Sequence, residues 1–273
     1  MTVRPTRLVL LGHPVRHSLS PVFQQAALDA AGISLRYEVL DVAPDALDAT
    51  LDSLIAQTAA GNATIPHKLA LHARCDVRSA VAIRTGAVNC WWVEDGRLHG
   101  DNTDVAGFDD AVRTLLGHVP SGARIALLGA GGAARAVATA VADWPHATLV
   151  IRNRSSDRAH TVATLGPIGR THVESDMSAA LPDVDLVVNA TSLGLDDDDP
   201  LVVDPAALRP GTACLDLVYR PAMTTWVRRA RACGLPAIDG LAMLVGQGAR
   251  AFERWTGVPA DRDAMWRALG RDP

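Results

Sequence analysis

The sequence predicts an α/β protein of two domains with a cleft between them. Strand-like apolar runs alternate with helix-like segments along most of the chain, which is the pattern of α/β folds. A glycine-rich turn near the middle separates an apolar run from an Ala-rich helical segment. A chain of 273 residues is also long enough to form two domains. These observations predict an N-terminal domain with a mixed sheet and a second domain with parallel strands.

The first hundred residues contain the elements of the mixed sheet. The expected strands are residues 7–12, 35–40 and 61–65, and the expected helices are residues 21–31 and 44–59. Ser20 is the expected N-cap of the first helix because Pro21 suits the first helical position. Residues 87–93 and 97–100 flank Glu94-Asp95-Gly96, which is a hairpin signal.

The remaining elements predict the second domain and a return to the first. Residues 104–116 form a connecting helix, and strands follow near 124–128, 147–151, 185–189, 213–217 and 236–239. Connections of this length between parallel strands require crossover helices. The last helix has an apolar face with Gln247 off the stripe, and we expect it to pack on the first domain. The predicted domains are therefore 1–104, completed by 241–273, and 105–240.

The glycine-rich turn has the G-x-G-x-x-A spacing of a dinucleotide-binding site. It comprises Gly129, Ala130, Gly131, Gly132 and Ala133, followed by a helix whose N-terminus favours a pyrophosphate. The next strand ends in a segment with Arg152, Arg154 and Arg158 instead of an acidic residue. Arginine there suits the 2′-phosphate of NADP, so we predict a Rossmann-like NADP-binding domain. The alternative is that these arginines are solvated surface charges.

Composition argues against several other classes of protein. A net charge of −4 gives no support for nucleic-acid binding, and no apolar stretch has the length of a membrane helix. No secretory leader is recognisable, and the four scattered cysteines are typical of reduced thiols, so we expect a cytoplasmic protein. The nine histidines show no ligand spacing, so no metal is expected.

Three polar clusters in the first domain suggest a site for a small polyhydroxylated acid. They are residues 17–21 with Ser18 and Ser20, residues 62–68 with Thr64 and Lys68, and Asn89 with the run 100–104 that ends in Asp104. A lysine close to a carboxylate can transfer a proton during carbonyl reduction. Plainer interpretations stay open: the serines and Asp104 could cap helices, and Lys68 could be solvated.

The order and spacing of these motifs resemble the shikimate dehydrogenase family over essentially the whole chain. The matching stretches are His17-Ser18-Leu19-Ser20-Pro21, Asn62-Ala63-Thr64-Ile65-Pro66-His67-Lys68, Gly86-Ala87-Val88-Asn89, Gly100-Asp101-Asn102-Thr103-Asp104, residues 129–135, Asn153-Arg154-Ser155, Asn189-Ala190-Thr191-Ser192, Asp216-Leu217-Val218-Tyr219 with Pro221, and residues 239–245 with Gln247. The resemblance implies reversible reduction of 3-dehydroshikimate to shikimate by NADPH, a step of aromatic amino-acid biosynthesis.

The resemblance also implies roles for individual residues. Lys68 and Asp104 match the acid/base pair, and Ser18 and Ser20 match the residues that hold the substrate carboxylate. Thr64, Asn89, Tyr219 and Gln247 match residues that contact or position the substrate. The cofactor would be lined by Gly129 to Ala133, Asn153, Arg154, Ser155, Arg158, Thr191, Leu217 and Gly240.

Some positions depart from the family pattern, and alternative functions remain. Val105 and Ala242 replace glycines that are common in the family, and Arg78-Ser79-Ala80 lacks a usual acidic residue. None of these is a proposed proton-transfer group. The alternatives are a quinate/shikimate or amino-shikimate dehydrogenase and, more distantly, a non-catalytic module that senses NADP or a metabolite. A monomer and a homodimer are equally compatible with the sequence.

Overall fold

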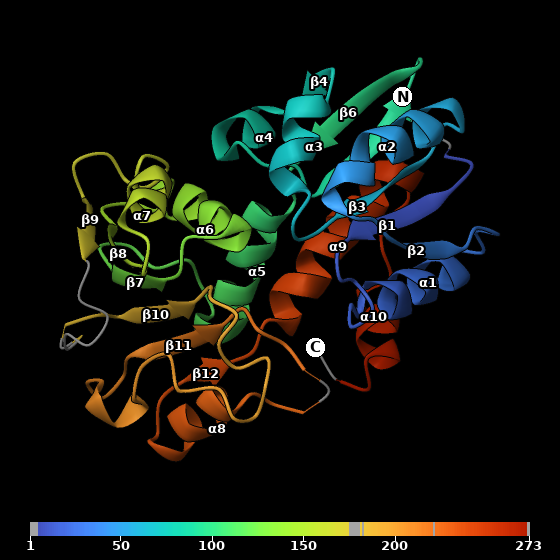
Figure 1. The fold of residues 1–273 in the computed structure, drawn as a ribbon. Helices are drawn as coiled ribbons and strands as arrows, with labels where there is room; N and C mark the ends of the chain where they lie inside the picture. Colours follow the sequence, from blue (N-terminus) through green and yellow to red (C-terminus); the bar gives the residue numbers. More distant parts are fainter. Residues whose placement is uncertain (1–4, 175–180, 182, 221, 272–273) are drawn as a thin grey trace. The chain divides into compact units, whose positions relative to one another are not determined.

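The computed structural model describes residues 5–174, 181, 183–220 and 222–271, which form two compact units (Figure 1). The first unit contains the residues up to Gly107 and those from Leu244 onward, and the second contains Phe108–Met243. Two helices, α5 (Asp104–Leu116) and α9 (Leu241–Thr256), begin in one unit and end in the other. The first unit is therefore built from both ends of the chain.

The first unit is organised around a six-stranded mixed sheet with the order β2-β1-β3-β5-β6-β4. Its strands are β1 (Leu8–Gly12), β2 (Tyr37–Asp41), β3 (Ala60–Ala63), β4 (Val77–Arg78), β5 (Cys90–Glu94) and β6 (Arg97–Asp101). Strand β1 is parallel to β2 and β3, whereas β5 is antiparallel to β3 and β6. The predicted mixed sheet is confirmed.

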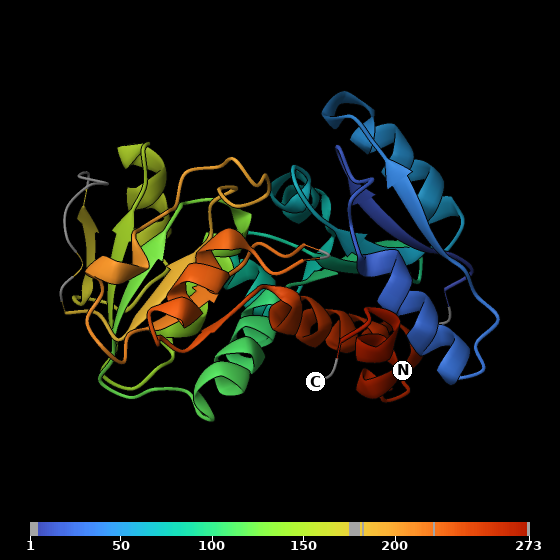
Figure 2. The same cartoon turned by 90° about the horizontal axis from the view of Figure 1, so that it is seen from below.

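Helices cover both faces of this sheet. They are α1 (Ser20–Ala30), α2 (Leu47–Ala56), α3 (Lys68–Arg74), α4 (Ala80–Thr85) and α10 (Arg262–Ala268), with a 3-10 turn at Pro44–Ala46. Figures 1 and 2 show α1, α9 and α10 on one face and α2 and α3 on the other. Alternate residues of β1 divide between the faces, since Val9 and Leu11 share a buried cluster with Leu51 and Leu54 of α2.

The predicted N-cap of α1 is wrong. The helix begins at Ser20 itself, and its N-cap is Leu19, whose side chain makes no capping hydrogen bond. The Ser20 amide donates instead to Ser18 Oγ at 3.2 Å. The predicted helix 44–59 also ends early, at Ala56, because Thr58 has a positive φ of 49° that a helix does not allow.

The second unit contains a six-stranded parallel sheet with the order β12-β11-β10-β7-β8-β9. Its strands are β7 (Arg124–Leu128), β8 (Thr148–Arg152), β9 (Thr171–Glu174), β10 (Leu186–Asn189), β11 (Ala213–Asp216) and β12 (Ala237–Ile238). Helices α6 (Gly132–Ala142) and α7 (Ser156–Ala163) lie on one face and α8 (Thr225–Ala232) on the other (Figure 1). This is the strand order of doubly wound dinucleotide-binding domains, in which the order reverses between β7 and β10.

In the second sheet, one crossover prediction is wrong and one strand was missed. The connection from β10 to β11 contains only a 3-10 turn, Pro205–Ala207, where a helix was expected. Pro200, Pro205 and Pro210 explain this difference, because proline removes a helical donor and clashes with the preceding turn. Strand β9 was not predicted from the sequence because it has only four residues and is partly exposed.

Several general properties of the described residues bear on function. Cys75, Cys90 and Cys214 are buried and Cys233 is exposed, and all four are free thiols. Among the helices that the structure describes, none is both long and apolar enough to cross a membrane. Within those residues, no group of three His, Cys, Asp or Glu side chains is placed to hold a metal ion.

Candidate active site

The topology of the first sheet brings the predicted substrate residues to one edge. Strands β1, β3 and β6 run in the same direction, so their carboxyl ends share that edge. Residues 13–20 follow β1, residues 64–68 follow β3, and residues 102–104 follow β6. Asn89 lies at the same edge because it immediately precedes β5, which runs the opposite way. Ser18, Ser20, Thr64, Lys68, Asn89 and Asp104 therefore gather at the end of one sheet.

Lys68 and Asp104 form an ion pair at this edge. The Nζ atom of Lys68 lies 2.6 Å from Oδ2 of Asp104, and the two side chains are 15 % and 7 % exposed. Each residue begins a helix, Lys68 in α3 and Asp104 in α5, so their backbones are fixed by the strands that precede them. The pairing and burial exclude the interpretation of Lys68 as a solvated surface charge. They leave an ammonium and a carboxylate in contact, which is an arrangement suited to proton transfer.

Asn89 connects this ion pair to helix α9. Its Nδ2 donates to Asp104 Oδ1 at 2.8 Å and also lies 3.0 Å from Thr103 Oγ1 and 3.1 Å from Gln247 Oε1. Its Oδ1 accepts from the Thr103 amide at 2.7 Å. Gln247 is 7 % exposed, so its position off the apolar stripe of α9 directs it into a buried polar cluster. The structure thus joins Asn89, Asp104 and Gln247, which are distant in the sequence.

The predicted hydroxyl groups lie beside the same edge. Ser20 is buried at the start of α1, and Ser18 is half-buried before it. Thr64 is half-buried next to Gly12, the last residue of β1, where an added Cβ would lie 2.6 Å from Thr64 Cγ2. Glycine at position 12 therefore allows residue 64 to approach the loop that carries the serines.

Sequence reasoning did not predict a contribution from Tyr37. Its hydroxyl donates to Asn62 Oδ1 at 2.7 Å, and Asn62 Nδ2 donates to the Asn89 carbonyl at 3.0 Å. Burial raises the pKa of Tyr37 well above its ordinary value, so the phenol stays a neutral donor. These two hydrogen bonds hold the backbone carbonyl of Asn89 in place. Its only sequence signal was Asn62, which is a polar residue within an apolar strand.

In the second unit, the glycine-rich turn lies at the point where the strand order reverses. Gly129 follows β7 with a φ of +110°, and a Cβ there would lie 2.7 Å from the Ala190 carbonyl oxygen after β10. Only glycine combines this backbone conformation with such a close approach. Gly131 is the N-cap of α6 and, as a glycine, has no side chain that could cap the helix. The amides of its first turn are therefore available for an anion.

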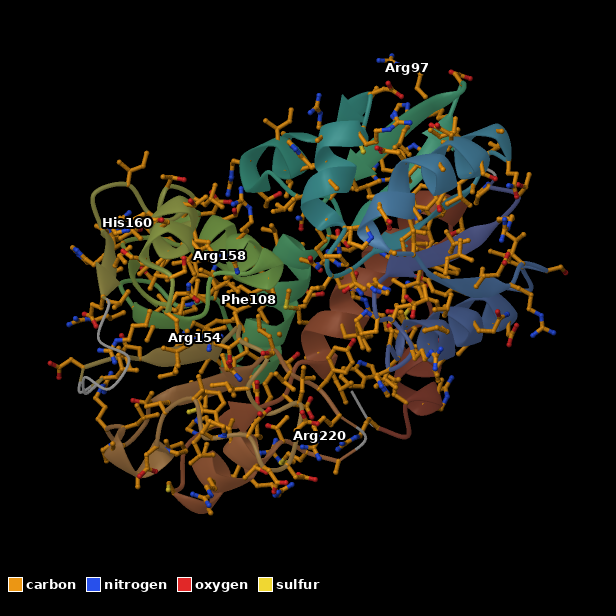
Figure 3. All side chains as sticks on the ribbon, in the orientation of Figure 1. Arg97, Phe108, Arg154, Arg158, His160 and Arg220 are labelled. Atoms are coloured by element: carbon orange, nitrogen blue, oxygen red, sulfur yellow. The ribbon has the colours of Figure 1, made fainter. Side chains whose placement is uncertain are left out.

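The tip of β8 presents two exposed arginines. Arg154 and Arg158 lie on the surface of the second unit, and among described residues neither guanidinium is paired with a carboxylate (Figure 3). Ser155 caps α7 by accepting from the Arg158 amide, while Asn153 Nδ2 donates to the Ser155 carbonyl at 2.9 Å. Arg152 differs, because it is buried and lies 2.6 Å from Glu174 Oε2 of β9. The basic tip therefore consists of two arginines, not the three that the sequence suggested.

The remaining predicted cofactor residues lie at the carboxyl ends of neighbouring strands. Thr191 Oγ1 donates to Asn189 Oδ1 at 2.7 Å after β10, and the Leu217 amide donates to the Asn189 carbonyl at 2.8 Å after β11. Gly240 packs so closely that a Cβ there would lie 2.3 Å from the Leu217 carbonyl oxygen. Tyr219 is half-buried and belongs to this unit, whereas the other predicted substrate residues belong to the first.

A buried carboxyl group stabilises this end of the second sheet. Asp216 accepts hydrogen bonds from Asn189 Nδ2 at 2.8 Å, from the Val218 amide at 3.1 Å and from Thr224 Oγ1 at 2.7 Å. Burial raises the pKa of the Asp216 carboxyl to about 6. Its bonds tie the ends of β10 and β11 to the N-cap of α8, which holds the loops that carry residues 191 and 217–219.

Comparisons with known proteins identify the family. Residues 10–91 match the model of the shikimate dehydrogenase substrate binding domain, and residues 240–269 match the shikimate 5'-dehydrogenase C-terminal domain. A shikimate dehydrogenase (NADP(+)) of Rubrobacter xylanophilus is 46 % identical over 268 residues, covering 95 % of this chain and 94 % of the relative. The chain belongs to the shikimate dehydrogenase family.

The fold is similar to solved structures of shikimate dehydrogenases and of a reductase with another substrate. The Thermus thermophilus shikimate 5-dehydrogenase in complex with NADP(H) and shikimate is 38 % identical, with a TM-score of 0.85 and coverage of 97 % of this chain and 98 % of that one. A 5-ketofructose reductase of Gluconobacter sp. strain CHM43 has the same TM-score at 29 % identity, with coverage of 98 % of both chains. The shared fold therefore serves more than one polyhydroxylated substrate.

Proposed function

We propose that this protein catalyses the reversible, NADP-dependent interconversion of 3-dehydroshikimate and shikimate. The observation that carries the proposal is the largely buried Lys68–Asp104 pair, 2.6 Å apart, at the sheet edge where Asn89 bonds to both Asp104 and Gln247. A pure binding module has no need of an ammonium and a carboxylate in contact at its site. The same polar cluster suits a small ring with several hydroxyl groups.

The reaction requires a hydride and a proton at one carbon–oxygen group. NADPH, when bound, supplies the hydride. The Lys68 ammonium then donates a proton to the alkoxide oxygen as it forms, and in the reverse direction the neutral amine takes the proton from the alcohol. Asp104 holds the Lys68 Nζ atom and has a second oxygen, Oδ1, fixed by Asn89. The pair therefore keeps its orientation in both directions of the reaction.

We assign the substrate contacts within the first unit. Ser18 and Ser20 bind the carboxylate, while Thr64, Asn89 and Gln247 contact or orient ring hydroxyl groups. Tyr219 is also assigned to substrate binding. The region 1–104 with 241–273 is the substrate domain in this proposal, and 105–240 is the cofactor domain.

The second unit provides groups of the right chemistry for NADP. Uncapped amides at the start of α6 and the close turn at Gly129 suit a pyrophosphate. Arg154 and Arg158 are exposed cations that suit a 2′-phosphate, with Asn153 and Ser155 shaping the loop between them. Thr191, Leu217 and Gly240 line the adjacent strand ends. We expect a monomer or homodimer that acts in the cytoplasm with neither nucleic acid nor membrane as partner.

The test is a steady-state assay of the purified chain. Shikimate, quinate, an amino-shikimate and fructose, the alcohol partner of 5-ketofructose, are each supplied with NADP and with NAD, and formation of the reduced cofactor is followed. The proposal predicts the highest kcat/KM for shikimate with NADP. Faster turnover of quinate with NAD would favour the quinate/shikimate alternative. Binding of NADPH without turnover of any alcohol would favour a sensing module.

A further inference from the structure

Helices α1 and α9 approach very closely at one glycine. A Cβ on Gly248 would lie 2.3 Å from Phe23 Cε2 and 2.6 Å from Phe23 Cζ. These separations are far below van der Waals contact, so no larger residue fits unless the phenyl ring moves. Phe23 is fully buried, which leaves its ring little room to move. The distance between the two helices therefore depends on the missing side chain at position 248.

A buried glutamine fixes the same crossing by hydrogen bonding. Gln24 is fully buried, and its Nε2 donates to the Gly248 carbonyl at 2.9 Å. Burying an amide is costly unless it is hydrogen-bonded, and an apolar side chain would fill this position without that cost. The bond has a defined direction, so it sets how α9 is rotated and shifted relative to α1 in a way that apolar packing does not.

The crossing lies next to two proposed substrate residues. Ser20 is four positions before Gln24, so the two side chains lie on the same face of α1, one turn apart. Gln247 is adjacent to Gly248 and shares a hydrogen bond with Asn89 Nδ2 at 3.1 Å. A shift of α9 along α1 would therefore change the separation of Ser20 and Gln247 before it affected the distant parts of the unit.

We propose that Gln24 and Gly248 are positioning residues for the substrate site. They seat α9 directly on α1 and thereby set the spacing between the carboxylate-binding end of the site at Ser20 and the hydroxyl-binding end at Gln247. Neither residue has to touch the substrate. The inference rests on the proposed function of Ser20 and Gln247. It adds that the contact between α1 and α9 determines the length of substrate that the site accepts.

The first test replaces Gln24 with methionine, which keeps the length of the side chain and removes the donor. We expect Gln24→Met to raise the KM for shikimate about 10-fold, as for a displacement of a fraction of an ångström at a binding group, with the KM for NADP changed less than about twofold. The matched control is Val22→Met on the same helix. Val22 is 45 % exposed, so the KM of this variant for shikimate should equal that of the unmodified protein.

The second test uses the close contact itself. Gly248→Ala should also raise the KM for shikimate, and Phe23→Leu in the same chain should relieve part of that increase, because it removes the two ring atoms that the new Cβ meets. Melting temperatures of all variants separate a loss of fold from a change in the site. If Gln24→Met fails to fold, the KM for shikimate of Gly248→Ala with and without Phe23→Leu tests the proposal by itself.

The outcomes separate this inference from the proposed function. Absence of shikimate turnover in the unmodified protein would refute the proposed function. Turnover in the unmodified protein, with an unchanged KM for shikimate in folded Gln24→Met and folded Gly248→Ala, would refute the positioning role alone. Equal increases in the KM for shikimate in Gln24→Met and Val22→Met would also refute it, because the effect would then be general to α1.

Discussion

Replacement of Lys68 by methionine tests the proton-transfer pair most directly. The side chain keeps its length and loses its charge, so the substitution removes the 2.6 Å contact with Asp104 without opening a large cavity. At that distance the interaction of two unit charges is about 6 kcal/mol for an effective dielectric constant of about 20, before desolvation is subtracted. Both side chains are largely buried, so solvent screens this contact less than it would a surface pair.

We expect Lys68→Met to lower kcat by about 10²–10⁴, the range for a general acid–base group, which corresponds to about 3–5 kcal/mol of activation free energy. The KM for shikimate should change much less. The free energy of unfolding should fall by about 3 kcal/mol, because Asp104 is left as a buried charge with no cation beside it. The assay is kcat and KM with shikimate and NADP, together with urea unfolding.

A double variant provides the control for this prediction. Lys68→Met combined with Asp104→Asn removes both charges, so it should recover part of the lost stability and none of the lost turnover. A kcat for Lys68→Met within about threefold of the unmodified protein would refute the assignment of Lys68 as the proton donor.

Three further predictions concern the second unit. Arg154→Asp should raise the KM for NADP about 10-fold or more, since a hydrogen bond to a charged group contributes about 1.5–3 kcal/mol. The variant should therefore shift its preference toward NAD. An unchanged ratio of kcat/KM for the two cofactors would show that other residues bind the 2′-phosphate. Gly129→Ala should weaken NADP binding, measured by titration calorimetry, because φ is +110° and the Cβ would lie 2.7 Å from the Ala190 carbonyl oxygen; unchanged affinity would show that the turn can relax. The folded pKa of Asp216 is about 6 against a reference of 3.8, so native protein binds more protons between these values and its stability falls as pH rises through them. Asp216→Asn should remove that loss, and its free energy of unfolding relative to the unmodified protein should rise by about 2 kcal/mol from about pH 4 to about pH 7; a constant difference would contradict the raised pKa.

Local sequence patterns predicted most elements of both sheets. They failed where proline prevents a helix after β10 and at the first residue of α1. The parallel strands of the second sheet are continuous apolar runs, as expected for strands covered on both faces. The missing crossover helix after β10 follows from three prolines that strand spacing alone does not take into account. The N-cap of α1 is Leu19 and not the predicted Ser20, because Ser20 is already the first residue of the helix. The Ser20 amide donates a hydrogen bond to Ser18 Oγ.

The candidate site shows the same division between local and long-range information. Spacing and residue type identified Lys68, Asp104 and Asn89 as polar groups at the ends of apolar runs. Their contact depended on antiparallel β5, which brings Asn89 to the edge where β3 and β6 end. Arg152, in contrast, was grouped with the phosphate-binding arginines from the sequence, but in the structure it is paired with Glu174. That pairing depends on β9, a strand that was not predicted.

The sequence by itself determined the α/β class, the dinucleotide-binding turn and the residue types available for proton transfer. These depend on periodicity and on the backbone freedom of glycine, which act over a few neighbouring residues. The family resemblance already implied that Lys68 pairs with Asp104, and the structure shows that contact. Only the tertiary structure decided that Asn89 meets Gln247 and that Gln24 meets the Gly248 carbonyl. Such contacts join residues up to 224 positions apart, and their geometry is set by sheet order and helix crossing, which no local pattern encodes.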